Sequence, residues 1–95
     1  MNVHWTRAAE LHLAAIYDYI AQHSPEYARQ IAGRLTSRSA QIALFPLSGR
    51  RVPEFDVDQT REVIDGAYRI IYYIKPDQID VLAVIHGAQD LLRAR

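Results

Sequence analysis

The sequence predicts an α+β domain in which a hairpin of two antiparallel helices covers one face of a small antiparallel sheet. Two observations predict this fold. The first half of the chain holds two consecutive stretches whose apolar residues recur at helical spacing. The second half holds three β-rich runs joined by tight-turn signals. The element order is strand, helix, helix and three strands, and the 95 residues contain no repeat or flexible linker, so residues 1–95 are expected to form a single domain.

Both predicted helices begin at recognisable N-caps. Residues 3–5 form a short apolar strand, and Thr6 follows as the cap of a helix of about 16 residues. Ser24 caps the second helix, with Pro25 in its first turn, where the missing N–H costs nothing. The apolar stripes are Ala9, Leu13, Ile16, Tyr17 and Ile20 in the first helix, and Ala28, Ile31, Ala32, Leu35 and Ile42 in the second. The short break between the helices requires them to fold back on each other.

The predicted sheet follows an irregular segment. Residues 45–60 contain two prolines and a glycine without a regular period, which predicts a loop. Asp65-Gly66 and Pro76-Asp77 each predict a two-residue turn, so three antiparallel strands result. The last residues, 88–95, are compatible with a short C-terminal helix.

The turn at Pro76-Asp77 predicts the strand register and therefore the two faces of the sheet. This register places Tyr72 across from Val81 and Arg69 across from Val84. The face covered by the helices is then expected to hold Tyr68, Ile70, Tyr72, Ile74, Ile79, Val81, Ala83 and Ile85. The open face is expected to hold Arg69, Ile71, Tyr73, Asp80, Leu82, Val84 and His86.

The predicted open face combines charged groups with an apolar patch. Arg69 and His86 would be diagonal neighbours on it, and Glu62 would lie opposite Arg69 as an ion-pair partner. Ile71 and the apolar residues beside it would expose more apolar surface than a solitary monomer usually does. Two interpretations stay open: the patch binds a protein partner, or a loop or the C-terminal tail folds over it.

Composition narrows the classes of function. The chain has no cysteine, and its four histidines show no metal-ligand spacing, so we expect no metal site and no cofactor. Net charge is zero, which argues against binding through many phosphates, and ten of the eleven basic groups are Arg, which suits protein contacts. No apolar run approaches a membrane span and no signal peptide is evident, so a cytoplasmic location without membrane contact is expected.

Several motifs in order resemble a known family. They are W…A…HL…I…YI in the first helix, SPEYA opening the second, P.SGR..PE in the loop, and REV…GAYRIIY and IDVLAVIHGAQDLL in the strands. Together they resemble the ParE/RelE superfamily of type II toxins, and in particular its ParE-like branch. The resemblance implies a bacterial toxin that inhibits growth, is neutralised by a tightly bound antitoxin, and meets operator DNA only through that antitoxin. The ParE-like branch implies DNA gyrase as the target.

The resemblance also allows a ribosome-dependent messenger RNA endoribonuclease, as in the RelE-like branch. Arg69 matches an arginine of those nucleases, but their lysine pair falls at Thr60 and Glu62, and their last arginine falls at Gln89. A YoeB-like set would consist of Glu54, Arg69 and His86, with Gly87 where a tyrosine is expected. An inactive corepressor that only binds antitoxin is a third reading.

The leading interpretation is inhibition by protein binding, without catalytic residues. The residues expected to bind partners are Arg50, Arg51, Arg61, Arg69, Ile71, Tyr73, Leu82, Val84, His86 and Leu91. Gln89 stands where the ParE-like branch usually has a basic residue, so this part of the predicted surface departs from the family pattern.

Overall fold

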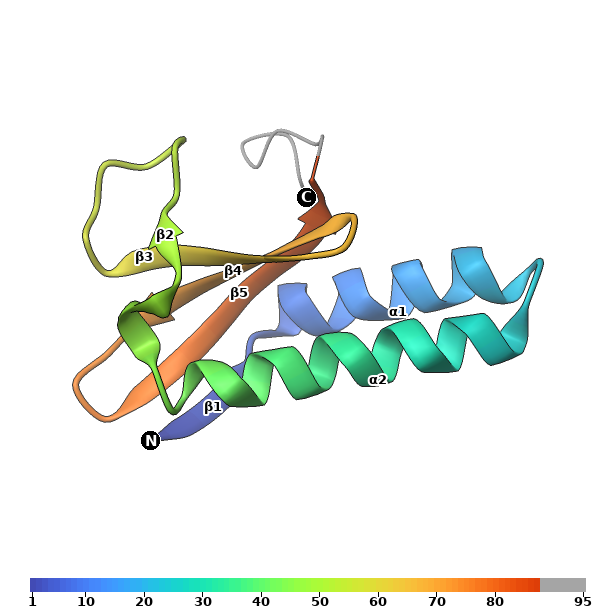
Figure 1. The fold of residues 1–95 in the computed structure, drawn as a ribbon, viewed down its shortest axis with the longest axis horizontal. Coiled ribbons are helices and arrows are strands. Elements are labelled where there is room, and N and C mark those ends of the chain that lie inside the picture. Colours follow the sequence, from blue (N-terminus) through green and yellow to red (C-terminus); the bar gives the residue numbers. More distant parts are fainter. Residues whose placement is uncertain (88–95) are drawn as a thin grey trace.

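The computed structural model describes residues 1–87, which form two helices and one five-stranded sheet (Figure 1). In chain order the elements are β1 (Asn2–Trp5), α1 (Arg7–Ala21), α2 (Pro25–Ile42), the 3-10 turn η1 (Pro46–Ser48), β2 (Arg50–Arg51), β3 (Thr60–Asp65), β4 (Tyr68–Ile74) and β5 (Gln78–His86). The sheet order is β1-β5-β4-β3-β2, with β1 parallel to β5 and the other pairs antiparallel. The predicted α+β fold is confirmed, although β2 was not expected and the sheet is mixed. The predicted C-terminal helix lies outside the described residues.

Both helices begin at the predicted caps. The Thr6 hydroxyl accepts a hydrogen bond from the N–H of Ala9 at 3.2 Å, and the Ser24 hydroxyl accepts one from Tyr27 at 3.1 Å. The two helices lie antiparallel along one face of the sheet (Figure 1). Neither helix of the described chain is long and apolar enough to cross a membrane.

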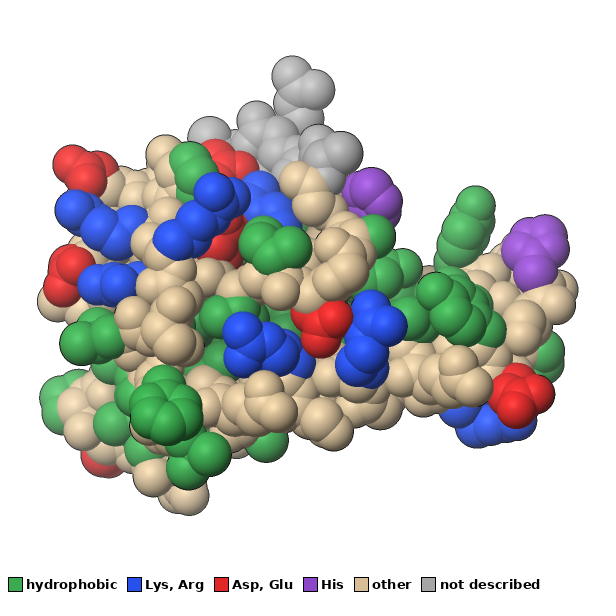
Figure 2. Space-filling view, in the orientation of Figure 1, with side chains coloured by type: hydrophobic (Ala, Val, Ile, Leu, Met, Phe, Trp, Pro, Cys, Tyr) green, Lys and Arg blue, Asp and Glu red, His purple; other side chains and the backbone are tan. Residues whose placement is uncertain are grey.

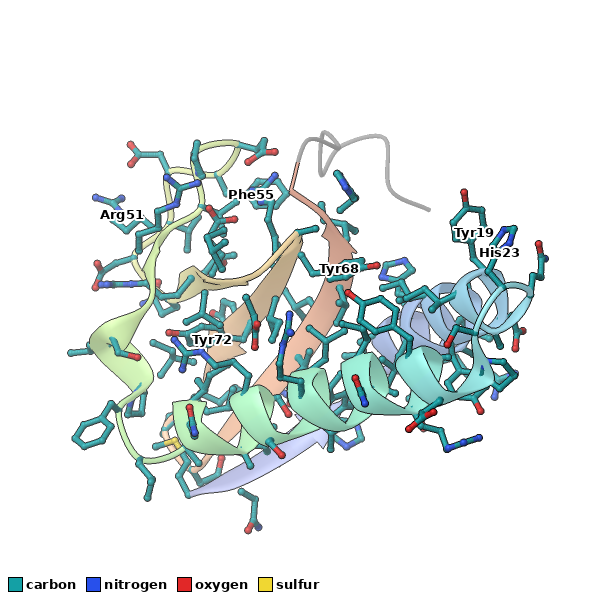
Figure 3. All side chains as sticks on the ribbon, turned by 45° about the vertical axis from the view of Figure 1, so that its right-hand side comes forward. Tyr19, His23, Arg51, Phe55, Tyr68 and Tyr72 are labelled. Atoms are coloured by element: carbon teal, nitrogen blue, oxygen red, sulfur yellow. The ribbon has the colours of Figure 1, made fainter. Side chains whose placement is uncertain are left out.

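The main core lies between the helices and the sheet. Its buried residues are Ala9, Ile31, Leu35, Ile42, Val63, Ile70, Tyr72, Ile79, Val81 and Val84. Figure 3 shows Tyr68 and Tyr72 on the helix side of the sheet. The same view shows Arg51 on β2 and Phe55 on the loop that follows β2. Full burial of each large aliphatic side chain contributes about 1.5–3 kcal/mol, so this face supplies much of the folding free energy.

A bulge in β5 changes the predicted register. Tyr72 pairs with Val81 as predicted, but Ile71 pairs with Ala83, which leaves Leu82 as the extra residue. Every later side chain of β5 therefore points to the face opposite to the predicted one. Val84 belongs to the helix-side core, whereas Ala83 and Ile85 lie on the other face. The predicted faces of Ala83, Val84 and Ile85 are therefore wrong. The predicted pairing of Arg69 with Val84 is also wrong, because Arg69 pairs with Ile85.

Contacts from Thr6, the cap of α1, and from His12 within α1 stabilise this bulge. The Thr6 hydroxyl donates to the carbonyl of Val81 at 2.9 Å, and the Thr6 N–H donates to the same oxygen at 3.0 Å. The N–H of Val84 donates to His12 Nδ1 at 3.2 Å. Backbone groups displaced from the regular ladder therefore find partners on the helix, as buried polar groups require.

The β3–β4 turn also differs from the prediction. Asp65 pairs with Tyr68, so the two loop residues are Gly66 and Ala67, and Gly66 has a φ of 58°. Glu62 consequently pairs with Ile71 instead of Arg69. The register moves by two residues, and because strand side chains alternate with a period of two, Glu62 remains on the same face as Arg69.

The second face of the sheet is not open. Val52 packs there against Ile71, Ala83 and Ile85, and all four side chains are buried. Figure 2 shows acidic and basic side chains gathered over β2 and β3. The expectation of an exposed apolar patch is therefore wrong, and the alternative that a loop folds over this face is the one observed.

Candidate functional site

Arg69 lies at the centre of a cluster of charged side chains on the loop-covered face. Its Nε donates to Glu62 Oε1 at 2.6 Å. Its Nη1 and Nη2 donate to the two carboxylate oxygens of Glu54 at 2.9 and 2.8 Å, which is the bidentate geometry of the strongest arginine pairs. The side chains of Arg69 and Glu62 are only 7% and 0% exposed. The guanidinium is therefore held between two carboxylates and largely removed from water.

A fourth residue completes this arginine-carboxylate cluster of Arg50, Glu62, Arg69 and Glu54. Arg50 Nε donates to Glu62 Oε2 at 2.6 Å, so the buried Glu62 carboxylate is bound on both oxygens. The hydrogen bond with Glu54, together with the one to Glu62, raises the pKa of Arg69 above its already high ordinary value, although burial acts in the opposite direction. Among these four described residues, positive and negative charges alternate and balance.

The SGR segment sets the position of Arg50 relative to the sheet. The Gly49 N–H donates to the Tyr72 hydroxyl at 3.0 Å, and this hydroxyl donates to the carbonyl of Pro46 at 2.6 Å. A Cβ at Gly49 would lie 2.4 Å from the Tyr72 oxygen and 2.6 Å from the carbonyl oxygen of Glu62, so only glycine fits. Burial raises the pKa of Tyr72, which keeps its hydroxyl protonated as a donor. The glycine therefore allows the chain between η1 and β2 to lie closely against Glu62 of β3 and Tyr72 of β4.

His86 points to the opposite face of the sheet from Arg69. It pairs across the sheet with Tyr68, and the two rings meet edge to face with centroids 6.1 Å apart. Tyr68 packs against the helix-side core, whereas the partner of Arg69 in the ladder, Ile85, belongs to the loop-covered face. Of the three residues in the alternative nuclease set, the structure brings Glu54 and Arg69 together and places His86 on the opposite face of the sheet.

The other predicted partner-binding residues fall into three groups. Ile71 and Val84 are buried in the two cores, and Tyr73, Leu82 and Arg61 are partly buried. Arg61 donates to the carbonyl of Gly49 and pairs with Asp58, and Arg51 pairs with Asp56 at 2.6 Å. Arg50, Arg51 and His86 are exposed. Leu91 and Gln89 lie outside the described residues.

Within residues 1–87, no group of three or more metal-ligating side chains is positioned to hold a metal ion.

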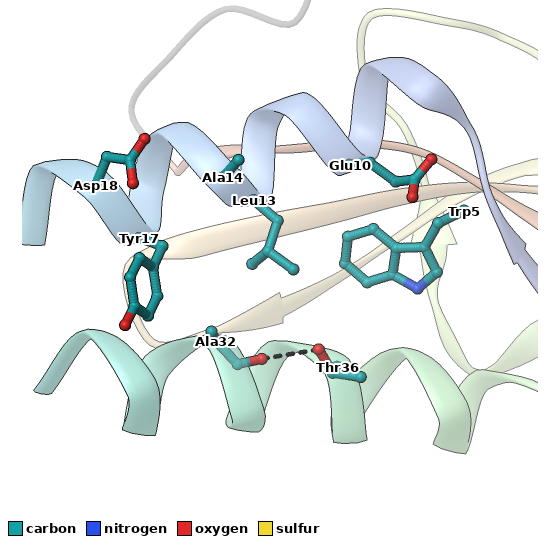
Figure 4. A pocket seen from close by; sticks show the side chains of 8 residues that line it. All are labelled: Trp5, Glu10, Leu13, Ala14, Tyr17, Asp18, Ala32 and Thr36. Carbon is teal, nitrogen blue, oxygen red and sulfur yellow. Dashed lines mark hydrogen bonds between the residues drawn. The ribbon is translucent and has the colours of Figure 1, made fainter. Parts of the chain in front are cut away.

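A groove that the sequence did not predict lies between α1 and α2 (Figure 4). Its volume is about 610 Å³, which is within the range of binding sites in proteins. The groove is lined by Trp5, Glu10, Leu13, Ala14, Tyr17, Asp18, Ala32 and Thr36. The available signal in the sequence was the pair of small lining residues, Ala14 and Ala32, one on each helix.

Comparisons with known proteins agree with one another. Residues 3–91 match the family described as ParE toxin of type II toxin-antitoxin system, parDE. Toxin RelE2 of Caulobacter vibrioides is 34% identical over 89 residues, which cover 93% of this chain and 97% of that protein. Putative toxin Y4kP of Sinorhizobium fredii is 32% identical over 90 residues, which cover 93% of this chain and 90% of that protein.

Two solved structures share the fold. The chromosomal ParDE TA system from P. aeruginosa contains a chain with a TM-score of 0.74 and 24% identity, matched over 90% of this chain and 95% of that chain. The toxin-antitoxin complex RelBE2 from Mycobacterium tuberculosis contains one with a TM-score of 0.64 and 20% identity, with the same coverage of both chains. At these identities the similarity shows the fold.

Proposed function

The chain belongs to the ParE toxin family of type II toxin-antitoxin systems, and from this premise we propose that it inhibits bacterial growth by binding a protein target, DNA gyrase. We further propose that a cognate antitoxin neutralises it and supplies any contact with operator DNA. The two structural relatives are described as a toxin-antitoxin system and a toxin-antitoxin complex, which supports an antitoxin partner for this chain.

We favour protein binding over RNA cleavage because the Arg69 side chain is already paired with the carboxylates of Glu54 and Glu62. Cleavage through a ribose hydroxyl needs a general base, a general acid and a cation that stabilises the developing phosphorane charge. The cation available here already pairs with two carboxylates. Moving it to a phosphate would break a buried ion pair, at a cost of about 3–5 kcal/mol.

The position of His86 supports the same choice. A base and a cation that act on one phosphodiester must converge on one point, whereas His86 and Arg69 project from opposite faces of the sheet. Exposed Arg50 and Arg51 remain candidates for contact with the target, because Arg is enriched at protein interfaces.

The endoribonuclease is the second candidate, and one observation favours it. Glu54 and Arg69, two of the three residues in the YoeB-like set, are in direct contact at 2.8 Å. Such a carboxylate would serve as a general base if substrate binding separated the pair.

Two assays with the purified full chain test these proposals side by side. In the first, DNA gyrase supercoils plasmid in the presence of increasing amounts of the chain. In the second, the chain is added to ribosomes that carry a messenger RNA, and the messenger RNA is then examined for cleavage. We expect inhibition of supercoiling and intact messenger RNA. Cleaved messenger RNA with unaffected gyrase would replace the proposed function with the nuclease, and inactivity in both assays would favour the corepressor.

A further inference from the structure

The turn that follows α2 exposes three large apolar side chains. Leu44, Phe45 and Leu47 lie close together in the chain and are 72%, 69% and 67% exposed. Figure 2 shows hydrophobic side chains gathered at the end of the molecule where α2 passes into η1. We call these three residues the η1 surface. Single exposed apolar residues are ordinary, but a group of them on one turn is typical of a binding surface.

The backbone that carries the η1 surface is held at both ends. The N–H groups of Leu44 and Phe45 donate to carbonyls in the last turn of α2, at 3.0 and 3.2 Å. The Ser48 N–H donates to the Phe45 carbonyl at 3.0 Å, and the Tyr72 hydroxyl of β4 donates to the Pro46 carbonyl at 2.6 Å. The apolar side chains are therefore exposed on a backbone of defined conformation. A partner that binds here would lose little affinity to ordering of the turn.

The η1 surface lies in a basic part of the chain. Residues 27–53 contain five arginines and neither Asp nor Glu. Arg50 and Arg51 come shortly after Leu47, and both remain exposed although each pairs with a carboxylate. The border of the η1 surface is therefore positive on the side of β2.

Arg38 adds positive charge from the last part of α2. Its Nη1 donates to the amide oxygen of Gln41 at 3.4 Å, and no carboxylate of residues 1–87 lies within ion-pair distance of it. Burial raises the pKa of Tyr72, and Arg38 is near enough to act in the opposite direction. Because the Tyr72 hydroxyl also holds Pro46, Arg38 lies close to η1.

The chemistry of the η1 surface favours one kind of partner. A second copy of the chain, related by a two-fold axis, would bring arginines of the two copies together, and this repulsion opposes binding. A nucleic acid would pair with the arginines, but Leu44 and Leu47 offer no ring on which a base could stack. A protein surface with an apolar pocket bordered by Asp and Glu complements both the apolar side chains and the arginines.

From these observations we infer that the η1 surface binds the protein target of the toxin, and that the target presents an apolar pocket bordered by carboxylates. This inference rests on the proposed function, in which the target is DNA gyrase. Phe45 would enter the pocket as the central anchor, because aromatic side chains are enriched at the buried centres of interfaces. Arg38 and Arg51 would face the carboxylates at the border, where charge contributes mainly to specificity and to the association rate.

A supercoiling titration with the purified full chain tests the inference. Leu44→Ser combined with Phe45→Ser removes most of the η1 surface. At least about 30-fold more of this variant should be needed to halve gyrase activity, the size of effect seen when a dominant anchor is lost. Leu11→Ser combined with Tyr19→Ser is the matched control, because it removes exposed apolar side chains from α1, and it should inhibit like the unchanged chain. Thermal unfolding checks that each variant keeps the fold, and unchanged inhibition by the folded Leu44→Ser/Phe45→Ser variant would overturn the inference.

Charge reversal at the border is a second test that leaves the apolar side chains in place. Arg38→Glu should weaken inhibition about 10-fold at low salt and less at high salt, because salt screens charges at the border of an interface. Arg29→Glu is the control, since it changes the net charge equally but lies about 14 Å further from η1 along α2. Neither arginine forms an ion pair in the described part of the chain. Equal effects of the two substitutions would overturn the inference.

The same variants separate this inference from the proposed function. If the unchanged chain does not inhibit gyrase, the proposed function and the inference both fail. If the unchanged chain and the Leu44→Ser/Phe45→Ser variant inhibit gyrase equally, the inference alone fails.

Two further assays of the Leu44→Ser/Phe45→Ser variant identify a different occupant of the η1 surface. In growth assays the variant is produced together with the antitoxin encoded beside the toxin, and a variant that stops growth and escapes rescue would assign the surface to the antitoxin. In the ribosome assay, messenger RNA that is cleaved by the unchanged chain and not by the variant would assign the surface to a nucleic acid. Either result would overturn the inference, whereas loss of gyrase inhibition alone is the result we expect.

Discussion

The two faces of the sheet are closed in different ways. On the helix-covered face, many apolar side chains from α1, α2 and the sheet pack together, with Leu35 and Ile70 fully buried. On the loop-covered face, a smaller apolar cluster lies beside the arginine-carboxylate cluster. Stabilisation is therefore distributed on the first face and concentrated in a few polar contacts on the second. The second face should be the more sensitive to removal of a single charged group.

Removal of Arg69 is expected to have the largest effect. Arg69→Ala would leave the buried carboxylate of Glu62 with Arg50 alone and Glu54 without its bidentate partner. We expect the free energy of unfolding to fall by about 3–5 kcal/mol in denaturant titrations. Arg51→Ala, which breaks the exposed pair with Asp56, is the control and should cost less than about 1 kcal/mol. Similar losses for the two variants would show that the cluster is not the main support of this face.

A methyl group at Gly49 should be the next most damaging change. It would collide with the Tyr72 hydroxyl and the carbonyl of Glu62, and forced repacking of this kind costs about 1–3 kcal/mol. Gly33→Ala, inside α2 with open space around the new carbon, should instead stabilise the protein by about 0.5–1 kcal/mol. Thermal melts of both variants measure the difference. If Gly49→Ala leaves the melting temperature unchanged, the fold does not need the observed close approach of Gly49 to Tyr72 and Glu62.

Trimming one methyl group from each face compares their packing directly. Ile70→Val acts on the helix-covered face and Ile71→Val on the loop-covered face, and both side chains are almost completely buried. We expect each to cost about 0.5–1.5 kcal/mol in the same denaturant titration. If Ile71→Val costs nothing, the loop-covered face is loosely packed and relies on its charges alone.

The smallest expected effect is a pH dependence that originates at the bulge. Burial lowers the pKa of His12 below its ordinary value of 6.5, and neutral Nδ1 accepts the N–H of Val84. His12 therefore binds a proton more readily in the unfolded chain than in the folded one. The free energy of unfolding should have its full value above pH 6.5 and fall as the pH is lowered below it, by less than about 1.4 kcal/mol per pH unit. The slope should be smaller in His12→Gln. An unchanged slope in that variant would remove His12 from the explanation.

The sequence predicted the parts of the fold that depend on local chemistry. The caps Thr6 and Ser24 and the Pro76-Asp77 turn are specified by neighbouring residues, and all three were located correctly. The bulge at Leu82 was missed because its support comes from Thr6 and His12, more than 70 positions away in the chain. One extra residue then reversed the predicted faces of four side chains, Ala83, Val84, Ile85 and His86.

The candidate site was predicted less completely than the fold. Contact between Glu62 and Arg69 was expected and is observed, since an error of two residues in register preserves the face. Contact between Glu54 and Arg69 could not be derived from strand periodicity, because Glu54 lies in a loop whose path depends on Gly49 and Tyr72. The groove between the helices was missed because helical periodicity marks apolar faces without giving the space left between them.

Growth inhibition by the His86→Ala variant tests most directly whether the toxin acts without an Arg69–His86 catalytic pair. The variant and the unchanged chain are induced to equal protein levels without antitoxin, and the growth rate is compared. Because His86 and Arg69 lie on opposite faces of the sheet, we expect nearly unchanged inhibition. A general base contributes about 10²- to 10⁴-fold to a reaction, so loss of inhibition by a folded variant, together with cleaved messenger RNA, would contradict the account.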